Sequence, residues 1–480
     1  MNAKRLATAA IACTLTLMAP VVPQGATAAT SPSQTADQSD ECIPKGEDDA
    51  YGFHLGFPRS PLRGPTRGRM QVAAIYVDFD DEPARGDATS IHAQTIPPGL
   101  TQLERLSHGQ LDAESIQTRS WIRMPQPKSF YFPPDGGEAG PRFFDLVDDA
   151  IVAADSELDF SDVDIVGITL EQSALQPPLG VAIVEGANVI TADGNDIVNA
   201  FVLSHPLNRP DTVVAHEILH NLGLPDLYDY SAVSLEIPVP RHRFVGGFST
   251  MGDNRGHSPE LFAWEQWVLG WLDDASVVCL DEGATEVELS AVSARSGTRM
   301  AVVPLGGNRF VAVEVRARGG LDSPPVPGVL PYLVSVDTPT GLGPIRVPAT
   351  RDPLVIDPLP VGTQWVIEGV GLEILSSRGG TYRVRVHPDV PAPSKPGRVG
   401  GLRATKSSKY VTVAWTKPLA PGWTTITGYE YRVGKGPWIR TGSERVRIPA
   451  AKLKESLRVQ VRAVNSSGPG LPSSLSLRNR

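Results

Sequence analysis

Short segments in which apolar and polar residues alternate run through the C-terminal half of the chain. Such alternation is typical of β-strands that bury one face. Between residues 276 and 390 it marks 286–292, 300–304, 309–316, 332–337, 364–368 and 381–387. Beyond residue 390 it marks 410–415, 429–433 and 457–465. Clusters of Gly, Pro and Ser separate these segments, so the pattern predicts one β-sandwich over 276–390 and a second over 391–480.

Residues 69–275 show both extended and helical patterns. Apolar runs at 71–79 and 165–168 predict buried strands. Apolar residues with helical spacing predict helices at 143–154, 211–222 and 261–269. The sequence therefore predicts a multidomain protein, in which an α+β domain over 69–275 precedes the two β-sandwiches.

The first residues have the composition of a secretory signal peptide. Lys4 and Arg5 precede an apolar stretch over 6–18, and Ala26-Thr27-Ala28 is a small-residue cleavage motif. The alternative is a membrane anchor, but about 13 apolar residues are too few to span a bilayer. We therefore expect residues 1–28 to be a signal peptide and 29–68 to be a short pro-segment or extension. The mature protein is then expected to be secreted, without a membrane span.

Charge divides the chain near residue 390. The segment 391–480 contains 17 Lys and Arg and 3 Asp and Glu, a net charge of +14; the whole chain carries −9, so the remainder carries −23. The sequence 388–396 (PDVPAPSKP) is typical of a stiff linker. An anionic cell-wall polymer is the candidate partner of this basic module, with a solvated surface or docking on the acidic remainder as alternatives. Nucleic acid is not expected as a partner, because the module lacks a nucleic-acid-binding signature.

Two cysteines remain once the signal peptide, with Cys13, is removed. Cys42 and Cys279 form an even pair in an exported protein, which favours one disulfide between them. The alternative is that the Cys42 thiolate blocks a metal site in a latent form of the protein.

The candidate metal-binding and catalytic residues lie around position 216. His216 and His220 are separated by four residues on a predicted helix, so both imidazoles project from one face and can share a Zn²⁺ ion. Glu217 follows the first histidine and can reach a metal-bound water, which is the position of a general base. Asp211 precedes the helix and is expected to be its N-cap.

Gly223 is expected to end this helix and to let the chain turn back. Asp226, three residues later, then supplies a carboxylate to the same metal. Two histidines and one aspartate leave a fourth position open for water, as a catalytic zinc requires. The alternative is a helix whose histidines are only hydrogen-bonded or exposed.

The extended motif H-E-x-x-H-x-x-G-x-x-D resembles that of the metzincin-type zinc peptidases. Its continuation HNLGLPDLYD, and FSTMGDNRGHSPELFAWEQWVLGWL further on, resemble the immune inhibitor A family of secreted bacterial metalloproteases. Likeness to that family also includes AAIYVDFDD, RFVAVEVR and LPYLVSVD, and extends over about residues 69–390. The resemblance implies a zincin/metzincin-like catalytic domain, an endopeptidase acting on protein or peptide substrates, and a turn that places Met251 beneath the zinc ligands.

The last 90 residues resemble a fibronectin type III domain. Trp415 lies on an early strand, and VRAVNSSGPGLPS lies on a late one. Leu457 departs from the family pattern, which usually has a tyrosine at this position.

The resemblance to the immune inhibitor A family implies that Glu217 acts as the general base on a zinc-activated water. Asp253 occupies the place where some metzincins carry the tyrosine that stabilises the oxyanion. Tyr228, Tyr230 and His257 are the candidates for that role, and the sequence does not choose among them. Ser249 and Ser258 are interpreted as turn residues.

Other functions stay open at this stage. One is a catalytically inactive secreted adhesin that binds through its β modules, and another is a zinc amidase acting on cell-wall peptides. The acidic run 78–82 and Asp229 are candidate Ca²⁺ ligands with a structural role; for the run, a solvated acidic turn is the alternative, since EF-hand spacing is absent.

Overall fold

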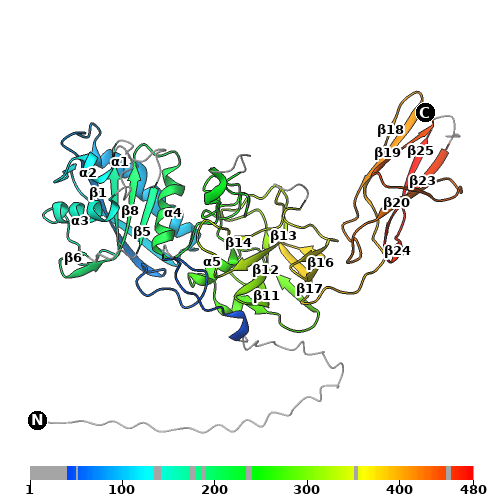
Figure 1. Ribbon diagram of the computed structural model, residues 1–480, viewed down its shortest axis with the longest axis horizontal. Coiled ribbons are helices and arrows are strands. Elements are labelled where there is room, and N and C mark those ends of the chain that lie inside the picture. Colours follow the sequence, from blue (N-terminus) through cyan, green and yellow to red (C-terminus); the bar gives the residue numbers. More distant parts are fainter. Residues whose placement is uncertain are drawn as a thin grey trace, which may run out of the picture. The chain divides into compact units, whose positions relative to one another are not determined.

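The computed structural model describes residues 40–49, 52–133, 142–171, 180–184, 190–233, 240–350, 355–449 and 456–478. The predicted signal peptide and residues 29–39 lie outside these ranges. Within them the protein is mostly β-sheet, with few helices, and it contains several domains (Figure 1). No helix of this part of the chain is long and apolar enough to cross a membrane.

The N-terminal α+β domain is built on a six-stranded sheet. Its strand order is β2-β1-β4-β8-β5, with the short β3 also paired to β1. All pairs are parallel except the edge strand β5, which runs antiparallel to β8. The strands are β1 (Gly68–Asp78), β2 (Leu111–Gln117), β3 (Ile122–Arg123), β4 (Ile165–Leu170), β5 (Gly180–Val184) and β8 (Asn199–Ser204), and a separate hairpin consists of β6 (Ile190–Ala192) and β7 (Asn195–Ile197).

Helices cover both faces of this sheet. Alternate residues of its strands therefore belong to two different hydrophobic clusters. Met70, Val72 and Ala74 of β1 pack in one cluster with helices α1 and α4, and Ala73 and Ile75 pack in another with α3. The helices are α1 (Ala88–Leu106), α2 (Lys128–Tyr131), α3 (Phe143–Ala154), α4 (Pro210–Asn221) and α5 (Ala263–Val268), and the 3₁₀ turns are η1 (Asp40–Cys42), η2 (Tyr230–Val233) and η3 (Asp274–Ser276).

The five predicted elements of this domain are confirmed, as β1, β4, α3, α4 and α5. Helix α1, which contains Pro97 and Pro98, was not predicted. Proline usually ends a helix, so this pair concealed the longest helix among the described residues.

The central β region contains two sheets with a shared core. One has the order β14-β13-β12-β11-β9 and the other β10-β17-β16-β15. Their facing side chains, such as Val311, Val313 and Leu372, form one hydrophobic cluster. The strands are β9 (Val277–Cys279), β10 (Thr285–Leu289), β11 (Met300–Gly306), β12 (Arg309–Arg316), β13 (Gly328–Ser335), β14 (Ile345–Arg346), β15 (Gln364–Ile367), β16 (Val370–Arg378) and β17 (Thr381–His387).

The five-stranded sheet buries its other face as well. Phe310 and Ala312 of β12 and Tyr332 of β13 belong to the same cluster as Trp264 of α5 and Val214 of α4. The hydrophobic core of the α+β domain therefore continues across residue 276 into the central β region.

A disulfide joins Cys42 to Cys279, as predicted, and so ties the N-terminal segment to β9. The segment is packed into the body, since Cys42 and Leu55 are buried in the core cluster that contains α4.

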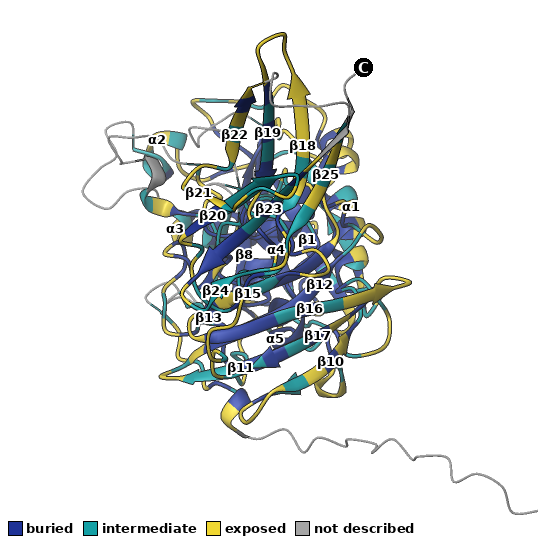
Figure 2. Ribbon diagram, turned by 90° about the vertical axis from the view of Figure 1, so that its right-hand side faces the viewer, coloured by how far each residue is buried: buried dark blue, intermediate teal, exposed yellow. Residues whose placement is uncertain are grey.

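The C-terminal module is a β-sandwich, as predicted. One sheet has the order β18-β19-β22, and the other β21-β20-β23, with β24 and β25 also paired to β23. Trp415 lies in the core between them, whereas β18 is mostly exposed (Figure 2). The strands are β18 (Gly400–Lys406), β19 (Tyr410–Thr416), β20 (Gly428–Val433), β21 (Ile439–Thr441), β22 (Arg445–Pro449), β23 (Ser456–Asn465), β24 (Gly468–Pro469) and β25 (Ser473–Arg478).

Candidate metal centre

Helix α4 begins and ends at residues that suit its two termini. Pro210 is its first residue, where a fixed φ and a missing N–H cost nothing. The N-cap is Arg209, and Asp211 lies in the first turn with its Oδ1 3.2 Å from Arg209 Nε. The prediction of Asp211 as N-cap is therefore wrong, because proline starts the helix one residue earlier. Gly223 follows the helix with φ +105°, as its predicted role requires.

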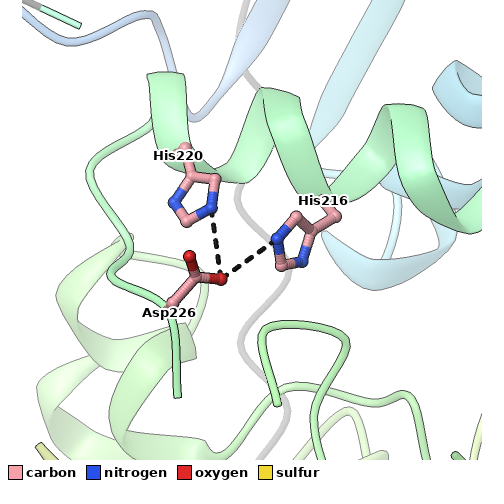
Figure 3. Close-up of side chains that lie close together, drawn as sticks. All are labelled: His216, His220 and Asp226. Atoms are coloured by element: carbon pink, nitrogen blue, oxygen red, sulfur yellow. Dashed lines mark ion pairs between the residues drawn. The ribbon is translucent and has the colours of Figure 1, made fainter. Parts of the chain in front are cut away.

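His216, His220 and Asp226 converge on one point (Figure 3). Asp226 Oδ1 lies 3.1 Å from His216 Nε2 and 3.4 Å from His220 Nε2. All three side chains are buried. Among the described residues, this is the one group of three such side chains close enough together to hold a metal ion.

Backbone carbonyls fix the orientation of both imidazoles. His216 Nδ1 donates to the Thr250 carbonyl at 3.0 Å, and His220 Nδ1 to the Leu224 carbonyl at 2.7 Å. In a neutral histidine whose Nδ1 carries the proton, Nε2 presents a lone pair. Two nitrogen lone pairs and a carboxylate oxygen, all of them buried, then face and repel one another. Only a positive charge between them makes this arrangement stable.

The donor atoms fit a zinc ion. Bonds of about 2.0–2.2 Å that meet at a tetrahedral angle separate ligand atoms by about 3.3 Å, close to the two distances measured here. Without a metal ion, a proton on His216 supplies the positive charge between the three side chains. Burial alone would lower the pKa of His216, but Asp226 raises it to about 9. Burial alone would raise the pKa of Asp226, yet the two histidines hold it well below its usual range.

The turn at Met251 supports two of the three candidate ligands. Thr250 accepts the His216 hydrogen bond, and the Met251 carbonyl accepts 3.0 Å from the N–H of Leu227, the residue after Asp226. Met251 itself is fully buried. Ser249 forms the turn, with φ +63° and its hydroxyl accepting from the Met251 N–H at 3.1 Å.

Glu217 lies beside the candidate ligands and beneath the edge strand β5. Its carboxylate accepts a hydrogen bond from the Ala182 N–H, and burial raises its pKa. The approach to β5 is close: a Cβ on Gly180 would lie 2.4 Å from Glu217 Oε1. Only glycine leaves room at this position for the carboxylate as it is placed.

A cleft of about 690 Å³ opens onto these side chains. His216, Glu217, His220 and Asp226 line it, together with apolar and aromatic residues. These neighbours come from β5, from the start of α3, from η2 and from loops far apart in the sequence: Phe53, Phe143, Phe144, Val181, Ala182, Ile183, Val184, Tyr228 and Tyr230. Such a groove has the size and lining of a binding site for an organic ligand.

The three candidate oxyanion donors lie in different places. Tyr230 donates its hydroxyl to Asp226 Oδ2 at 2.7 Å and so orients a candidate ligand. Tyr228 lines the cleft, with its ring stacked 6.2 Å from that of His216. His257 lies next to Ser258, with its Nδ1 3.0 Å from the Ser258 hydroxyl, and is not among the cleft residues.

The acidic run 78–82 meets positive charges of the chain itself. Asp78 pairs with Arg123 at 2.7 Å, and Asp81 accepts from the Lys128 backbone N–H at 2.8 Å. Lys128 also pairs with Glu82. Asp229, the other candidate calcium ligand, accepts from the Ser231 N–H at 2.9 Å and is paired with Arg243.

A buried group of charges lies behind the Met251 turn. Arg316 pairs with Glu314 at 2.5 Å and with Asp322 at 3.1 Å, and it donates to the Glu260 carbonyl at 3.0 Å. Burial raises the pKa of Glu260 to about 8. Four carboxyl groups with pKa values above their usual range, those of Glu260, Glu265, Glu314 and Asp322, face this single guanidinium.

Two residues of the site, Gly180 and Thr340, were not predicted from the sequence. Gly180 belongs to β5, which the hydrophobic pattern did not predict because only five residues form it. Thr340, which accepts a hydrogen bond from the Asp226 N–H at 2.8 Å, is 114 residues away from its partner. No local signal in the sequence points to either.

Neither a protein family nor a curated protein matches the chain. Solved structures similar to it include a human fibronectin type III domain, at 19% identity over 18% of this chain and 82% of that one, with a TM-score of 0.17. The FN5 domain of Drosophila Lar is 19% identical over 18% of this chain and 96% of its own, with a TM-score of 0.15. The Clostridium perfringens spore cortex lytic enzyme SleM is 15% identical over 22% of this chain and 38% of its own, with a TM-score of 0.17. At these scores the likenesses carry no argument about the candidate metal centre.

Proposed function

We propose that the protein is a secreted zinc-dependent endopeptidase with a zincin/metzincin-like catalytic domain. One observation carries the proposal: two histidine Nε2 atoms and the Asp226 carboxylate meet in a cleft whose next side chain is the buried Glu217. The resemblance of residues 69–390 to the immune inhibitor A family supports the same function.

His216, His220 and Asp226 would hold the zinc ion, and zinc would supply a water of lowered pKa and a polarised scissile carbonyl. Glu217 takes the proton of the attacking water and passes it to the leaving amine. The Tyr228 hydroxyl, at the wall of the cleft, is the donor we assign to the developing oxyanion.

Strand β5 would orient the substrate. It is the last strand of its sheet, and its residues Val181 to Val184 line the cleft. Apart from the Ala182 N–H, which is bonded to Glu217, the backbone groups at the free edge of β5 can hydrogen-bond to an extended peptide, which adds as a further strand. Peptide binding along β5 brings a backbone carbonyl past Glu217 without depending on particular side chains of the substrate.

The C-terminal module would bind an anionic cell-wall polymer outside the cell. Arg445 and Arg447 of β22 pair with Ala414 and Thr412 of β19. Strand β18 pairs with the other edge of β19, so these small residues lie between the two arginines and β18. Arg403, Arg445 and Arg447 are all exposed. This face is suited to rows of phosphate or carboxylate groups.

Casein cleavage by the purified mature protein, beside its Glu217→Gln variant at equal zinc content, tests the function. Cleavage that disappears in the variant while zinc stays bound supports the peptidase. Zinc binding without cleavage of casein, but with cleavage of peptidoglycan stem peptides, would point to an amidase. A protein that binds no zinc would refute the proposal and favour a secreted adhesin.

A further inference from the structure

The N-terminal segment 44–66, of which residues 44–49 and 52–66 are described, lies beside the metal centre. The Phe57 N–H donates to the Pro44 carbonyl at 2.7 Å, and the Gly46 N–H donates to the Phe57 carbonyl at 3.2 Å. These bonds close a loop whose tip contains Asp49 and Phe53. Both tip residues line the cleft that contains the candidate zinc ligands.

Asp49 connects this loop to Asp226 through one intermediate residue. Its Oδ1 accepts from the Phe53 N–H at 3.1 Å and its Oδ2 from the Thr340 N–H at 2.8 Å. The Thr340 hydroxyl in turn accepts from the Asp226 N–H at 2.8 Å. Gly341, the next residue, donates its N–H to the Asp226 carbonyl at 3.0 Å, so both backbone groups of Asp226 are held by residues 340–341.

The same segment contacts the end of helix α4. The Phe53 ring lies 5.2 Å from the ring of His220. Arg59 donates to the Leu222 carbonyl at 3.2 Å and to the Gly64 carbonyl at 2.8 Å, and so caps the helix that carries both histidines. The segment thus contacts the helix that carries both histidines and is linked to Asp226 through Thr340.

We propose that segment 44–66 is a resident part of the metal centre, and that Asp49 is a positioning residue for Asp226, acting through Thr340. The inference rests on the proposed function, because it assumes that the three ligands bind zinc. Asp226 lies in a stretch without helix or strand, so its position depends on bonds from outside that stretch. Asp49 supplies the fixed acceptor that keeps Thr340 in place, and residues behind a metal ligand commonly contribute 10- to 100-fold to metal affinity.

This assignment reverses what a pro-segment would do. Removal of an inhibitory pro-segment uncovers a finished site, whereas removal of residues 44–66 would take away Asp49, Phe53 and Arg59 together. The Cys42–Cys279 disulfide keeps the segment attached even if the chain is cut near residue 50. We therefore expect the active protein to retain this segment.

Zinc affinity, measured by competition with a chelator, tests the proposal on the full mature chain. Asp49→Ala and Thr340→Val should each weaken zinc binding by about 10- to 100-fold, and the double variant by no more than the larger single effect. Asp49→Asn retains one acceptor oxygen and should restore part of the affinity. Glu47→Ala, an exposed change on the same loop, serves as the matched control and should bind zinc like the wild type.

Melting temperature and circular dichroism of the metal-free proteins separate positioning from misfolding. Wild-type zinc affinity in Asp49→Ala would overturn the proposal. So would a loss of affinity that is equally large in Asp49→Asn and that accompanies a lowered melting temperature. A wild type that binds zinc but cleaves nothing would overturn the proposed function alone, since zinc affinity still decides the role of Asp49. A wild type without zinc would overturn both.

Discussion

Gly180→Ala is expected to disable the proposed catalyst without removing the metal. The new Cβ would lie 2.4 Å from Glu217 Oε1 and 2.5 Å from Glu217 Cγ. Because carbon atoms and their neighbours prefer separations of about 3.5 Å, the carboxylate must move by about 1 Å. Because Cγ is met as well as the carboxylate, the whole buried side chain must turn, and we expect stability to fall by about 1–3 kcal/mol, as for other overpacking changes.

A displacement of about 1 Å is large for a reacting group. Misplacement by that amount can lower a rate about 100-fold, which corresponds to about 2.7 kcal/mol of activation free energy. We therefore expect kcat/KM for a fluorogenic casein substrate to fall about 100-fold. Bound zinc per chain should stay at the wild-type value, because the three atoms nearest to the new methyl group all belong to Glu217 and none to a candidate ligand.

The controls for this experiment are in the same chain. Gly442→Ala adds a methyl group where no atom lies within 4 Å, and it should leave activity unchanged. Glu217→Gln sets the residual rate expected when the base is absent. A Gly180→Ala protein with wild-type kcat/KM would show that Glu217 does not need its observed position, and one that loses zinc would show that the displacement spreads beyond it. Either result would refute the reasoning.

Three further outcomes follow from the structure. Replacing Cys42 and Cys279 together by serine should lower the free energy of unfolding by about 2–4 kcal/mol, measured by urea denaturation. Burial raises the pKa of Glu260 to about 8 and that of Glu265 to about 7, so the folded protein binds protons that the unfolded chain releases. Their contribution to the free energy of unfolding is complete below about pH 4.5 and is lost as the pH rises toward 8. The slope is about 1.4 kcal/mol per pH unit for each group. Glu260→Gln should flatten this slope when the free energy of unfolding is measured by urea denaturation at pH 5, 6.5 and 8. Tyr228→Phe should lower kcat on casein about 100-fold, with KM and bound zinc unchanged, if its hydroxyl stabilises the oxyanion; equal rates would exclude that role.

Local features of the site were predictable because their geometry is set within a few residues. The spacing of His216 and His220 fixes their shared helix face, and Gly223 and Asp226 follow within six residues of the second histidine. The disulfide was predictable as well, since only two cysteines remained to pair. The sandwich strands were visible because their alternation has a period of two and is repeated many times.

The remaining features of the site depend on contacts that leave no local pattern. Asp49 and Thr340 are 291 residues apart, and neither belongs to a periodic segment. Gly180 is needed because of a carboxylate on another element, so its own surroundings in the sequence show nothing unusual. Helix α1 was missed for the opposite reason: Pro97 and Pro98 give a strong local signal, which tertiary packing against α4 overrides.

The five-stranded sheet of the central β region also limits how the gene can be rearranged. A chain that lost residues 276–390 would leave α5 and the Met251 turn with an uncovered apolar surface, because one face of that sheet completes their core. The described residues of 391–480 form a separate hydrophobic cluster around Trp415. Recombination can therefore add, replace or delete the C-terminal module at the Pro-rich stretch near residue 390, whereas everything from Cys42 to His387 has to be inherited as one piece.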